Sequence, residues 1–199
     1  MMELKYLYDK ILIKDKTITL LDRFVLDFTK LIKPYRHVIV SGYVAIFFGR
    51  ARGTEDIGVL VEHMGKSQFS SFYSLVLKHD YYFLNPENEA GLYEMLCDGL
   101  GIRIAKKDTI IPNIEMKFTK DDFDEFSLSH RVEIDFDNEK LFFAPIEIQI
   151  PYKLYLGSDK DIEDAIFLWD IFNEKLDKTL LKRFMNELKV NGDIYGIIV

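Results

Sequence analysis

The sequence predicts an α+β fold built as one unit, and three observations lead to this prediction. Short β-branched and apolar runs alternate with helical patterns between residues 37 and 144, and the last quarter of the chain is helical in pattern. The chain has 199 residues, of which 48% are hydrophobic, enough for a substantial core. No repeat or low-complexity linker divides residues 1–199, so we expect an α/β core over about 35–145 and a helical C-terminal part over about 146–199.

The N-terminal segment is predicted to form one or two helices. Between Lys5 and Lys33 the apolar residues recur at helical spacing, and Pro34 stops the pattern. One face is marked by Leu20, Leu21, Phe24, Val25, Phe28 and Leu31.

The central segment opens with the pattern strand, glycine turn, helix, strand. "HVIV" at 37–40 is a β-branched strand, "YVAIFF" at 43–48 is an apolar helix, and "DIGVLVE" at 56–62 is a second strand. Further helices are predicted over 66–80 and 87–99, and further strands over 101–105, 113–118, 131–136 and 140–144. The acidic stretch 119–126 is expected to be a solvated turn, because it lacks the glycine and terminal glutamate of a calcium loop.

The C-terminal part is predicted to contain three helices, over 145–157, 158–176 and 178–190. Ser158 and Asp161 resemble a capping box at the start of the second helix.

Composition excludes several classes of function. The net charge of −7 and the lack of a long Lys/Arg run argue against bulk nucleic-acid binding. The single cysteine, Cys97, cannot form an intramolecular disulfide, which fits a reducing compartment. The N-terminus is charged from its third residue, and the apolar runs fall short of the roughly 20 residues that span a bilayer. We therefore expect a cytoplasmic protein without a membrane partner.

The stretch "SGYVAIFFGRARGTEDIG" carries a family resemblance. Ser41 with Gly42, then Gly49, Arg52, Thr54 and Asp56, fall at the spacing of the nucleotidyltransferase superfamily typified by DNA polymerase beta. The chain resembles in particular the small bacterial and archaeal nucleotidyltransferases of toxin–antitoxin systems. Lys153 ahead of "SDKDIEDA" is similar to the Lys-x(n)-Lys-Asp-x-x-Asp helix of the larger members.

This resemblance implies a nucleotidyltransferase-like mixed sheet flanked by helices, and transfer of a nucleoside monophosphate from a Mg²⁺-bound NTP to a hydroxyl acceptor of unknown identity. The implied nucleotide-binding residues are Ser41, Gly42, Arg52, Thr54 and Lys153. Ser41 and Gly42 stand between a strand and a helix, where unsatisfied backbone N–H groups favour the phosphates. Arg52 would meet a phosphate or pair with Asp56.

The carboxylates of such a site can be assigned only in part. Asp56 fits the first position, and Glu115, an acid in an apolar strand, is the best candidate for the third, with Glu133 and Asp135 as alternatives. Asp56 and Glu115 are thus the predicted catalytic residues and Mg²⁺ ligands. The second position is occupied by Gly58.

Neighbouring acids do not replace the missing carboxylate. Glu55 is out of phase and points to the other face of the strand, and Glu62 lies about 13 Å from residue 58 along the strand. Three hypotheses follow: a transferase with a single metal on Asp56 and Glu115, a catalytically degenerate fold that binds a nucleotide or a protein partner as in a toxin–antitoxin-like pair, and an interaction protein in which these residues only shape the fold.

Overall fold

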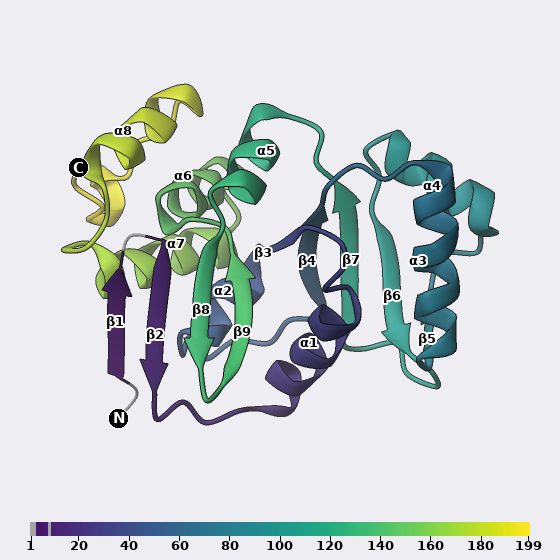
Figure 1. The fold of residues 1–199 in the computed structure, drawn as a ribbon. Coiled ribbons are helices and arrows are strands. Elements are labelled where there is room, and N and C mark those ends of the chain that lie inside the picture. Colours follow the sequence, from purple (N-terminus) through teal and green to yellow (C-terminus); the bar gives the residue numbers. More distant parts are fainter. Residues whose placement is uncertain (1–2, 8) are drawn as a thin grey trace.

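The computed structural model describes residues 3–7 and 9–199, and in this part of the chain it shows one mixed sheet with helices on both faces (Figure 1). The nine strands lie in the order β1-β2-β8-β9-β3-β4-β7-β6-β5. Their bounds are β1 Glu3–Leu7, β2 Lys10–Lys14, β3 His37–Val40, β4 Asp56–Val61, β5 Tyr81–Phe83, β6 Ile102–Lys106, β7 Asn113–Phe118, β8 Val132–Phe136 and β9 Glu139–Phe143. The helices are α1 Leu20–Leu31, α2 Gly42–Phe47, α3 Lys66–Lys78, α4 Glu89–Cys97, α5 Asp122–Ser129, α6 Ile146–Leu156, α7 Asp159–Phe172 and α8 Lys178–Glu187, with a 3₁₀ turn at Asp193–Tyr195. The predicted α+β class and mixed sheet are confirmed.

The N-terminal prediction was wrong for the residues before α1. β1 and β2 form an antiparallel hairpin, and β2 pairs in parallel with β8. In β2 the buried Ile11 and Ile13 alternate with the less buried Lys10, Leu12 and Lys14. Burial that alternates every second residue is typical of a strand and places both isoleucines on its core face. This alternation, and not the apolar content alone, distinguishes a strand from a helix here.

The acidic stretch 119–126 is not a turn, because α5 begins inside it. The side chain of Asp121 accepts hydrogen bonds from the backbone N–H groups of Phe123 and Asp124, which caps the helix. The following acids lie in the first turn, where they complement the positive end of the helix dipole. The short strand β5 was also not predicted.

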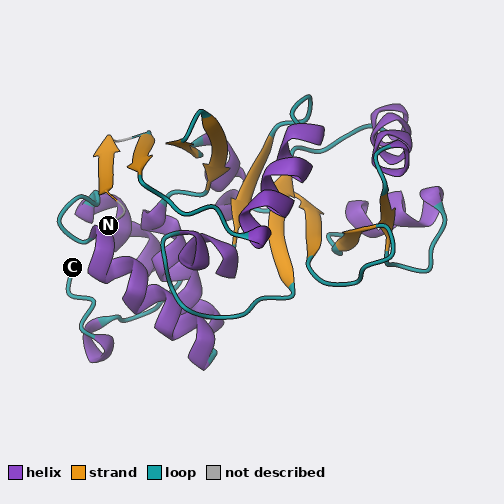
Figure 2. Cartoon of the chain, turned by 90° about the horizontal axis from the view of Figure 1, so that it is seen from below, coloured by secondary structure: helices purple, strands orange, loops and turns teal. Residues whose placement is uncertain are grey.

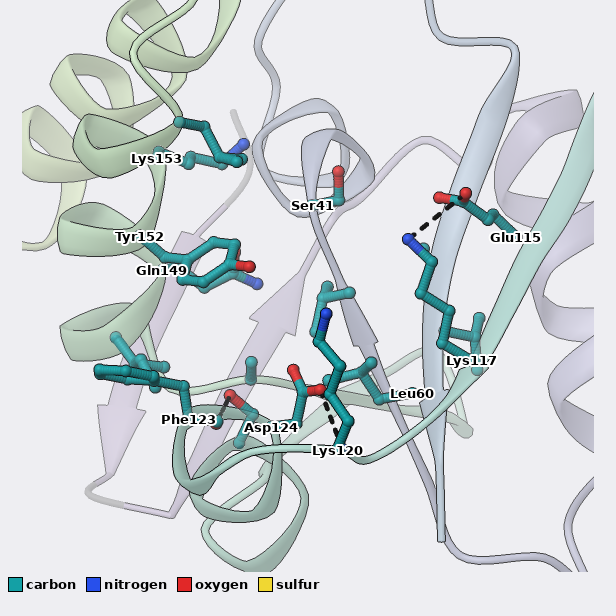
Figure 3. A pocket seen from close by; sticks show the side chains of 17 residues that line it. Ser41, Leu60, Glu115, Lys117, Lys120, Phe123, Asp124, Gln149, Tyr152 and Lys153 are labelled. Atoms are coloured by element: carbon teal, nitrogen blue, oxygen red, sulfur yellow. Dashed lines mark hydrogen bonds and ion pairs between the residues drawn. The ribbon is translucent and has the colours of Figure 1, made fainter. Parts of the chain in front are cut away.

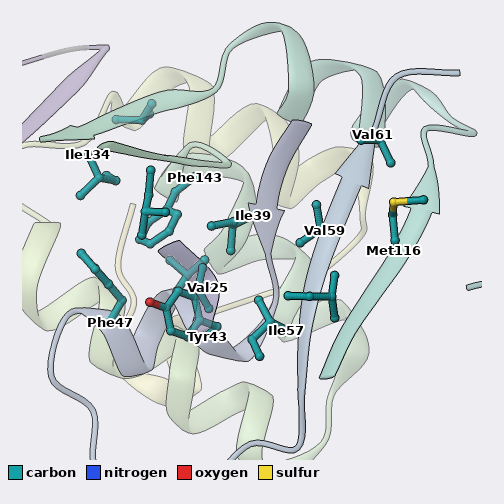
Figure 4. Close-up of a cluster of buried hydrophobic side chains, with 14 of the residues drawn as sticks. Val25, Ile39, Tyr43, Phe47, Ile57, Val59, Val61, Met116, Ile134 and Phe143 are labelled. Atoms are coloured by element: carbon teal, nitrogen blue, oxygen red, sulfur yellow. The ribbon is translucent and has the colours of Figure 1, made fainter. Parts of the chain in front are cut away.

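The core fills both faces of the central strands. Ile39, Ile57 and Val59 point to one face, where Tyr43 and Phe47 of α2 cover them (Figure 4). The opposite face carries a smaller cluster, formed by Val38, Leu60, Leu128, Ala144, Ile148 and Phe184. Burial on both faces explains the continuous apolar runs of β3 and β4.

The C-terminal helices form a group beside the sheet. α6 contacts both α7 and α8, and α7 contacts α2, the helix within the stretch 41–58 that carries the family resemblance. Figure 2 shows helices grouped near the C-terminus, beside the strands. Gly157 ends α6 in a left-handed conformation, and Ser158 caps α7 by accepting a hydrogen bond from the N–H of Asp161. Among residues 3–7 and 9–199, none of the helices combines the length and hydropathy needed to cross a membrane.

Candidate functional site

Two strand pairings bring the predicted site segments together. β3 is antiparallel to β4 with Val40 opposite Gly58, and β4 is parallel to β7 with Gly58 opposite Glu115. Residues that pair on neighbouring strands point to the same face of a sheet, and so do residues two positions apart on one strand. Asp56 at the start of β4 and Glu115 in β7 therefore point to the same face of the sheet, and Ser41 directly follows Val40, the residue that pairs with Gly58.

Asp56 and Glu115 are diagonal neighbours across β4 and β7. Standard strand spacings separate their Cα atoms by about 8 Å, and Asp56 is half-buried. The hydroxyl of Thr54 donates to the backbone carbonyl of Asp56 at 2.8 Å and lies 3.4 Å from its carboxylate Oδ1. Glu115 Oε1 lies 3.4 Å from Lys117 Nζ. Thr54 thus contacts the predicted metal ligand, while Glu115 pairs with a lysine.

The donor set fits one magnesium ion better than two. Within the described residues, no group of three or more His, Cys, Asp or Glu side chains is placed to hold a metal ion. Mg²⁺ is commonly bound by one or two carboxylates, with waters and substrate phosphates completing its shell. Asp56 and Glu115 supply two such carboxylates on one face.

Gly58 is required by the packing of its neighbours. A Cβ added at this position would lie 2.9 Å from Val40 Cγ2 and 3.2 Å from Ser41 Cβ. A side chain at this position therefore requires the Val40 methyl group to shift and Ser41 Cβ to move by a few tenths of an ångström.

The backbone at residues 41 and 42 is unusual. Ser41 has φ +72° and ψ −152°, a conformation that glycine adopts readily and serine rarely. Gly42 is buried, and an added Cβ would lie 2.6 Å from Arg52 Nη2, so the guanidinium group lies directly against this glycine. Gly42 is the first residue of α2, and the backbone N–H groups of a first helical turn have no acceptor within the helix.

Arg52 and Lys153 meet on Asp164, an acid of the "SDKDIEDA" stretch that was not among the predicted nucleotide-binding or metal-binding residues. Asp164 Oδ2 accepts hydrogen bonds from Arg52 Nη1 and from Lys153 Nζ, each at 2.7 Å. Arg50 forms ion pairs with Asp164 and with Glu163. The carboxylate of Asp164 is 0% exposed and the side chain of Lys153 2%. Arg52 thus pairs with Asp164 and not with Asp56. This buried cluster, Arg50, Arg52, Lys153 and Asp164, ties α6 and α7 to the loop before β4.

The two alternative carboxylates lie elsewhere on the sheet. Glu133 and Asp135 are on β8, which is separated from β4 by β9 and β3, or about 14 Å at normal strand spacing. Lys10 Nζ lies 3.0 Å from Glu133 and 2.6 Å from Asp135. The hydrogen bond from Lys140 and the one from Lys10 lower the pKa of Glu133. The geometry therefore favours Glu115 over both.

A pocket of about 270 Å³ opens beside Glu115, between the sheet and helices α5 and α6 (Figure 3). Val40, Leu60, Ala144 and Ile148 contribute its apolar surface. Its polar lining comes from Ser41, Glu115, Lys117, Lys120, Asp124, Ser127, Gln149, Tyr152 and Lys153. Of the predicted site residues, Ser41, Glu115 and Lys153 line the pocket, whereas Gly42, Arg52, Thr54 and Asp56 lie outside its lining.

Apart from Lys153, the pocket residues on α5 and α6 were not predicted from the sequence. Burial raises the pKa of Asp124, with a further contribution from the charge of Asp121. Burial also raises the pKa of Tyr152, and the charge of Asp124 adds to this shift. The only signal for them was a set of polar residues inside "DDFDEF" and "IEIQIPYK", which the predictions assigned to a turn and to a packing helix.

Comparison with known proteins identifies the fold. No protein-family model and no curated protein matches the sequence significantly. The chain is similar in structure to an antigenic nucleotidyltransferase-like protein from Paracoccidioides brasiliensis, with a TM-score of 0.51 and 15% identity over 87% of this chain and 88% of that one. It is also similar to the antibiotic-resistance factor ANT(2'')-Ia in its solution structure, with a TM-score of 0.56 and 12% identity over 90% of this chain and 95% of that one. These likenesses concern the fold, which is that of nucleotidyltransferase-like proteins, as the family-like spacing predicted.

Proposed function

We propose that this protein binds a nucleoside triphosphate as its Mg²⁺ complex and transfers the nucleoside monophosphate to a hydroxyl acceptor. The observation that carries the proposal is the parallel register of β4 and β7, which puts Asp56 and Glu115 on one face, next to the Ser41–Gly42 backbone. The nucleotidyltransferase-like fold supports it.

Asp56 and Glu115 would hold one Mg²⁺, which when bound would neutralise triphosphate charge and polarise the phosphate under attack. The backbone N–H groups that follow Ser41 donate hydrogen bonds to the phosphate oxygens. Thr54 keeps the Asp56 carboxylate in place through its hydroxyl group. The acceptor oxygen forms a bond to the α-phosphorus, pyrophosphate leaves, and the Glu115 carboxylate takes the acceptor proton.

A second candidate function is nucleotide binding without transfer, in a protein that acts through a protein partner. The glycine at position 58 favours it, because the second carboxylate of the usual clamp for two metal ions is missing there. In this case the protein binds Mg²⁺-NTP but releases no pyrophosphate.

The test is thermal unfolding with each NTP, with and without Mg²⁺, on the wild type, Asp56→Asn and Glu115→Gln. A ligand at a hundredfold excess over its Kd stabilises the native state by about 2.7 kcal/mol, which for a chain of this size raises Tm by roughly 5 to 10 °C. We expect this Mg²⁺-dependent shift in the wild type and its loss in both variants.

Glu133→Gln is the matched control, since it removes a carboxylate from the same sheet outside the site. Its shift should equal that of the wild type. Pyrophosphate release and transfer of label from α-labelled NTP then separate transfer from binding alone. The absence of any Mg²⁺-dependent shift in the wild type would refute both functions.

A further inference from the structure

We propose that the pocket beside Glu115 holds a nucleobase by its edge, and that the amide of Gln149 is the residue that determines which base binds. This inference deepens the proposed function, because it names the part of a nucleotide that enters the pocket.

Gln149 is the observation that points to a ligand. Gln149 is only 5% exposed and lines the pocket. Within the described residues, its side-chain Nε2 has no hydrogen-bond partner. Buried polar groups in native proteins are nearly always paired, since an unpaired one costs free energy. A ligand that offers a hydrogen-bond acceptor to this amide removes that cost.

The walls around Gln149 suit a flat, largely apolar ring. Leu60, Ala144 and Ile148 supply the apolar surface, and the aromatic rings of Phe123 and Tyr152 border the same space (Figure 3). A volume of about 270 Å³ is just below the range of about 300 to 1,000 Å³ for pockets that hold drug-sized ligands. The volume therefore suits a group somewhat smaller than a drug-sized ligand, such as a nucleobase with its sugar.

Asp124 supplies the complementary acceptor for the ligand. It lies across the pocket from α6, and one carboxylate oxygen accepts a hydrogen bond from the backbone N–H of Lys120 at 3.2 Å (Figure 3). A carboxylate has further lone pairs for a ligand donor. Nucleobases present both a donor and an acceptor along their edges, which matches a carboxylate together with an amide N–H.

The orientation of such a ligand follows from the rest of the lining. Gln149 and Tyr152 project from α6 on one side, whereas Ser41 and Glu115 lie on the sheet side (Figure 3). A base held on α6 thus directs its sugar and phosphates toward the Ser41 backbone and Glu115. The base belongs either to the NTP or to a nucleotide that serves as acceptor.

The experiment measures binding of adenosine, guanosine, cytidine and uridine, without metal, by thermal shift and by calorimetry. We expect at least one nucleoside to bind the wild type in preference to the others. Gln149→Leu, which keeps the side-chain size but removes the amide, should raise the Kd of that nucleoside at least tenfold and abolish the preference. The same variant should fold with an unchanged or higher Tm in the absence of ligand, because leucine leaves no buried polar atom unpaired.

Two further variants control for indirect effects. Gln68→Leu makes the same chemical change on α3, where the side chain caps the helix by accepting from the N–H of Gly65 at 3.0 Å, and it should leave nucleoside binding unchanged. Ala144→Leu fills the apolar wall and should abolish binding. The inference is overturned if no nucleoside binds the wild type, or if Gln149→Leu binds nucleosides as the wild type does.

Mg²⁺-NTP binding by Asp56→Asn separates this inference from the proposed function. Nucleoside binding that depends on Gln149, with no Mg²⁺-dependent NTP binding, supports the pocket and refutes the function. If the wild type shows Mg²⁺-dependent NTP binding that Gln149→Leu leaves unchanged, and no nucleoside binds, the proposed function is supported and the inference about the pocket is refuted. If nucleoside and NTP compete, the pocket holds the base of the NTP, and if they bind together, it holds the base of the acceptor; either result supports the inference.

Discussion

Replacement of Asp164 by asparagine tests whether the buried cluster holds the C-terminal helices to the sheet. The carboxylate is 0% exposed and pairs with Arg50, Arg52 and Lys153, whose side chains are 13%, 17% and 2% exposed. Breaking a buried pair by removing one partner leaves uncompensated buried charge and costs about 3–5 kcal/mol. Asp164→Asn leaves three cations without their shared carboxylate, so we expect a loss in this range.

This loss is a large part of the 5–15 kcal/mol typical of a native domain. For a chain of this size it lowers Tm by roughly 6 to 20 °C. Urea unfolding followed by circular dichroism and by Trp169 fluorescence measures the free energy, and Trp169 lies in α7, the helix that carries Asp164.

Asp161→Asn is the matched control for this measurement. Its carboxylate is 21% exposed and lies 3.6 Å from Lys153 Nζ, so its loss should cost about 1 kcal/mol or less. A second comparison combines Asp164→Leu with Lys153→Met, which removes two opposite charges together and should recover part of the stability. If Asp164→Asn unfolds within 1 kcal/mol of the wild type, the reasoning about this cluster is wrong.

Two further substitutions test the packing at the site and the pH dependence of stability. Gly58→Ala should lower the free energy of unfolding by about 1–3 kcal/mol, because its Cβ would lie 2.9 Å from a methyl group of Val40. Gly53→Ala, where an added Cβ would have nothing within 4 Å, should leave this free energy unchanged or raise it slightly. Equal effects of the two substitutions on chemical unfolding would show that the contact with Val40 is not the cause. Burial lowers the pKa of the His37 imidazole, and the nearby Arg131 charge lowers it further. Below the unfolded-state pKa of about 6.5 the unfolded chain therefore binds a proton that the native state does not, and unfolding free energy falls as pH falls. His37→Phe should flatten this dependence between pH 7 and 5 in urea titrations, and an unchanged slope would show that another group causes it.

Local patterns predicted most of the elements correctly. The segment from His37 to Val61 has its strand, helix and strand where the apolar runs and glycines placed them, because each boundary depends on neighbouring residues. The same local reasoning failed at residues 5–14, where a period of two was taken for helical spacing. It also failed at 119–126, where Asp121 is a helix cap.

The candidate site was only partly accessible from the sequence. The spacing of Ser41, Gly42, Arg52, Thr54 and Asp56 indicated a nucleotidyltransferase-like fold, and the comparisons confirm that fold. Their roles in binding remain predictions. The pairing of Arg52 with Asp164 joins residues more than a hundred positions apart, which no local pattern contains.

The sequence by itself determined the order of most strands and helices, the glycine at position 58 and the acids available for a metal, since these depend on residue identity and short-range periodicity. Only the tertiary structure decided that Glu115, and not Glu133 or Asp135, lies beside Gly58, and that Gln149 and Asp124 face one pocket. The physical reason is that strand register and helix docking are set by burial of apolar surface across the whole sheet, and a side chain can be assigned to a site only after those long-range contacts have fixed the face to which it points.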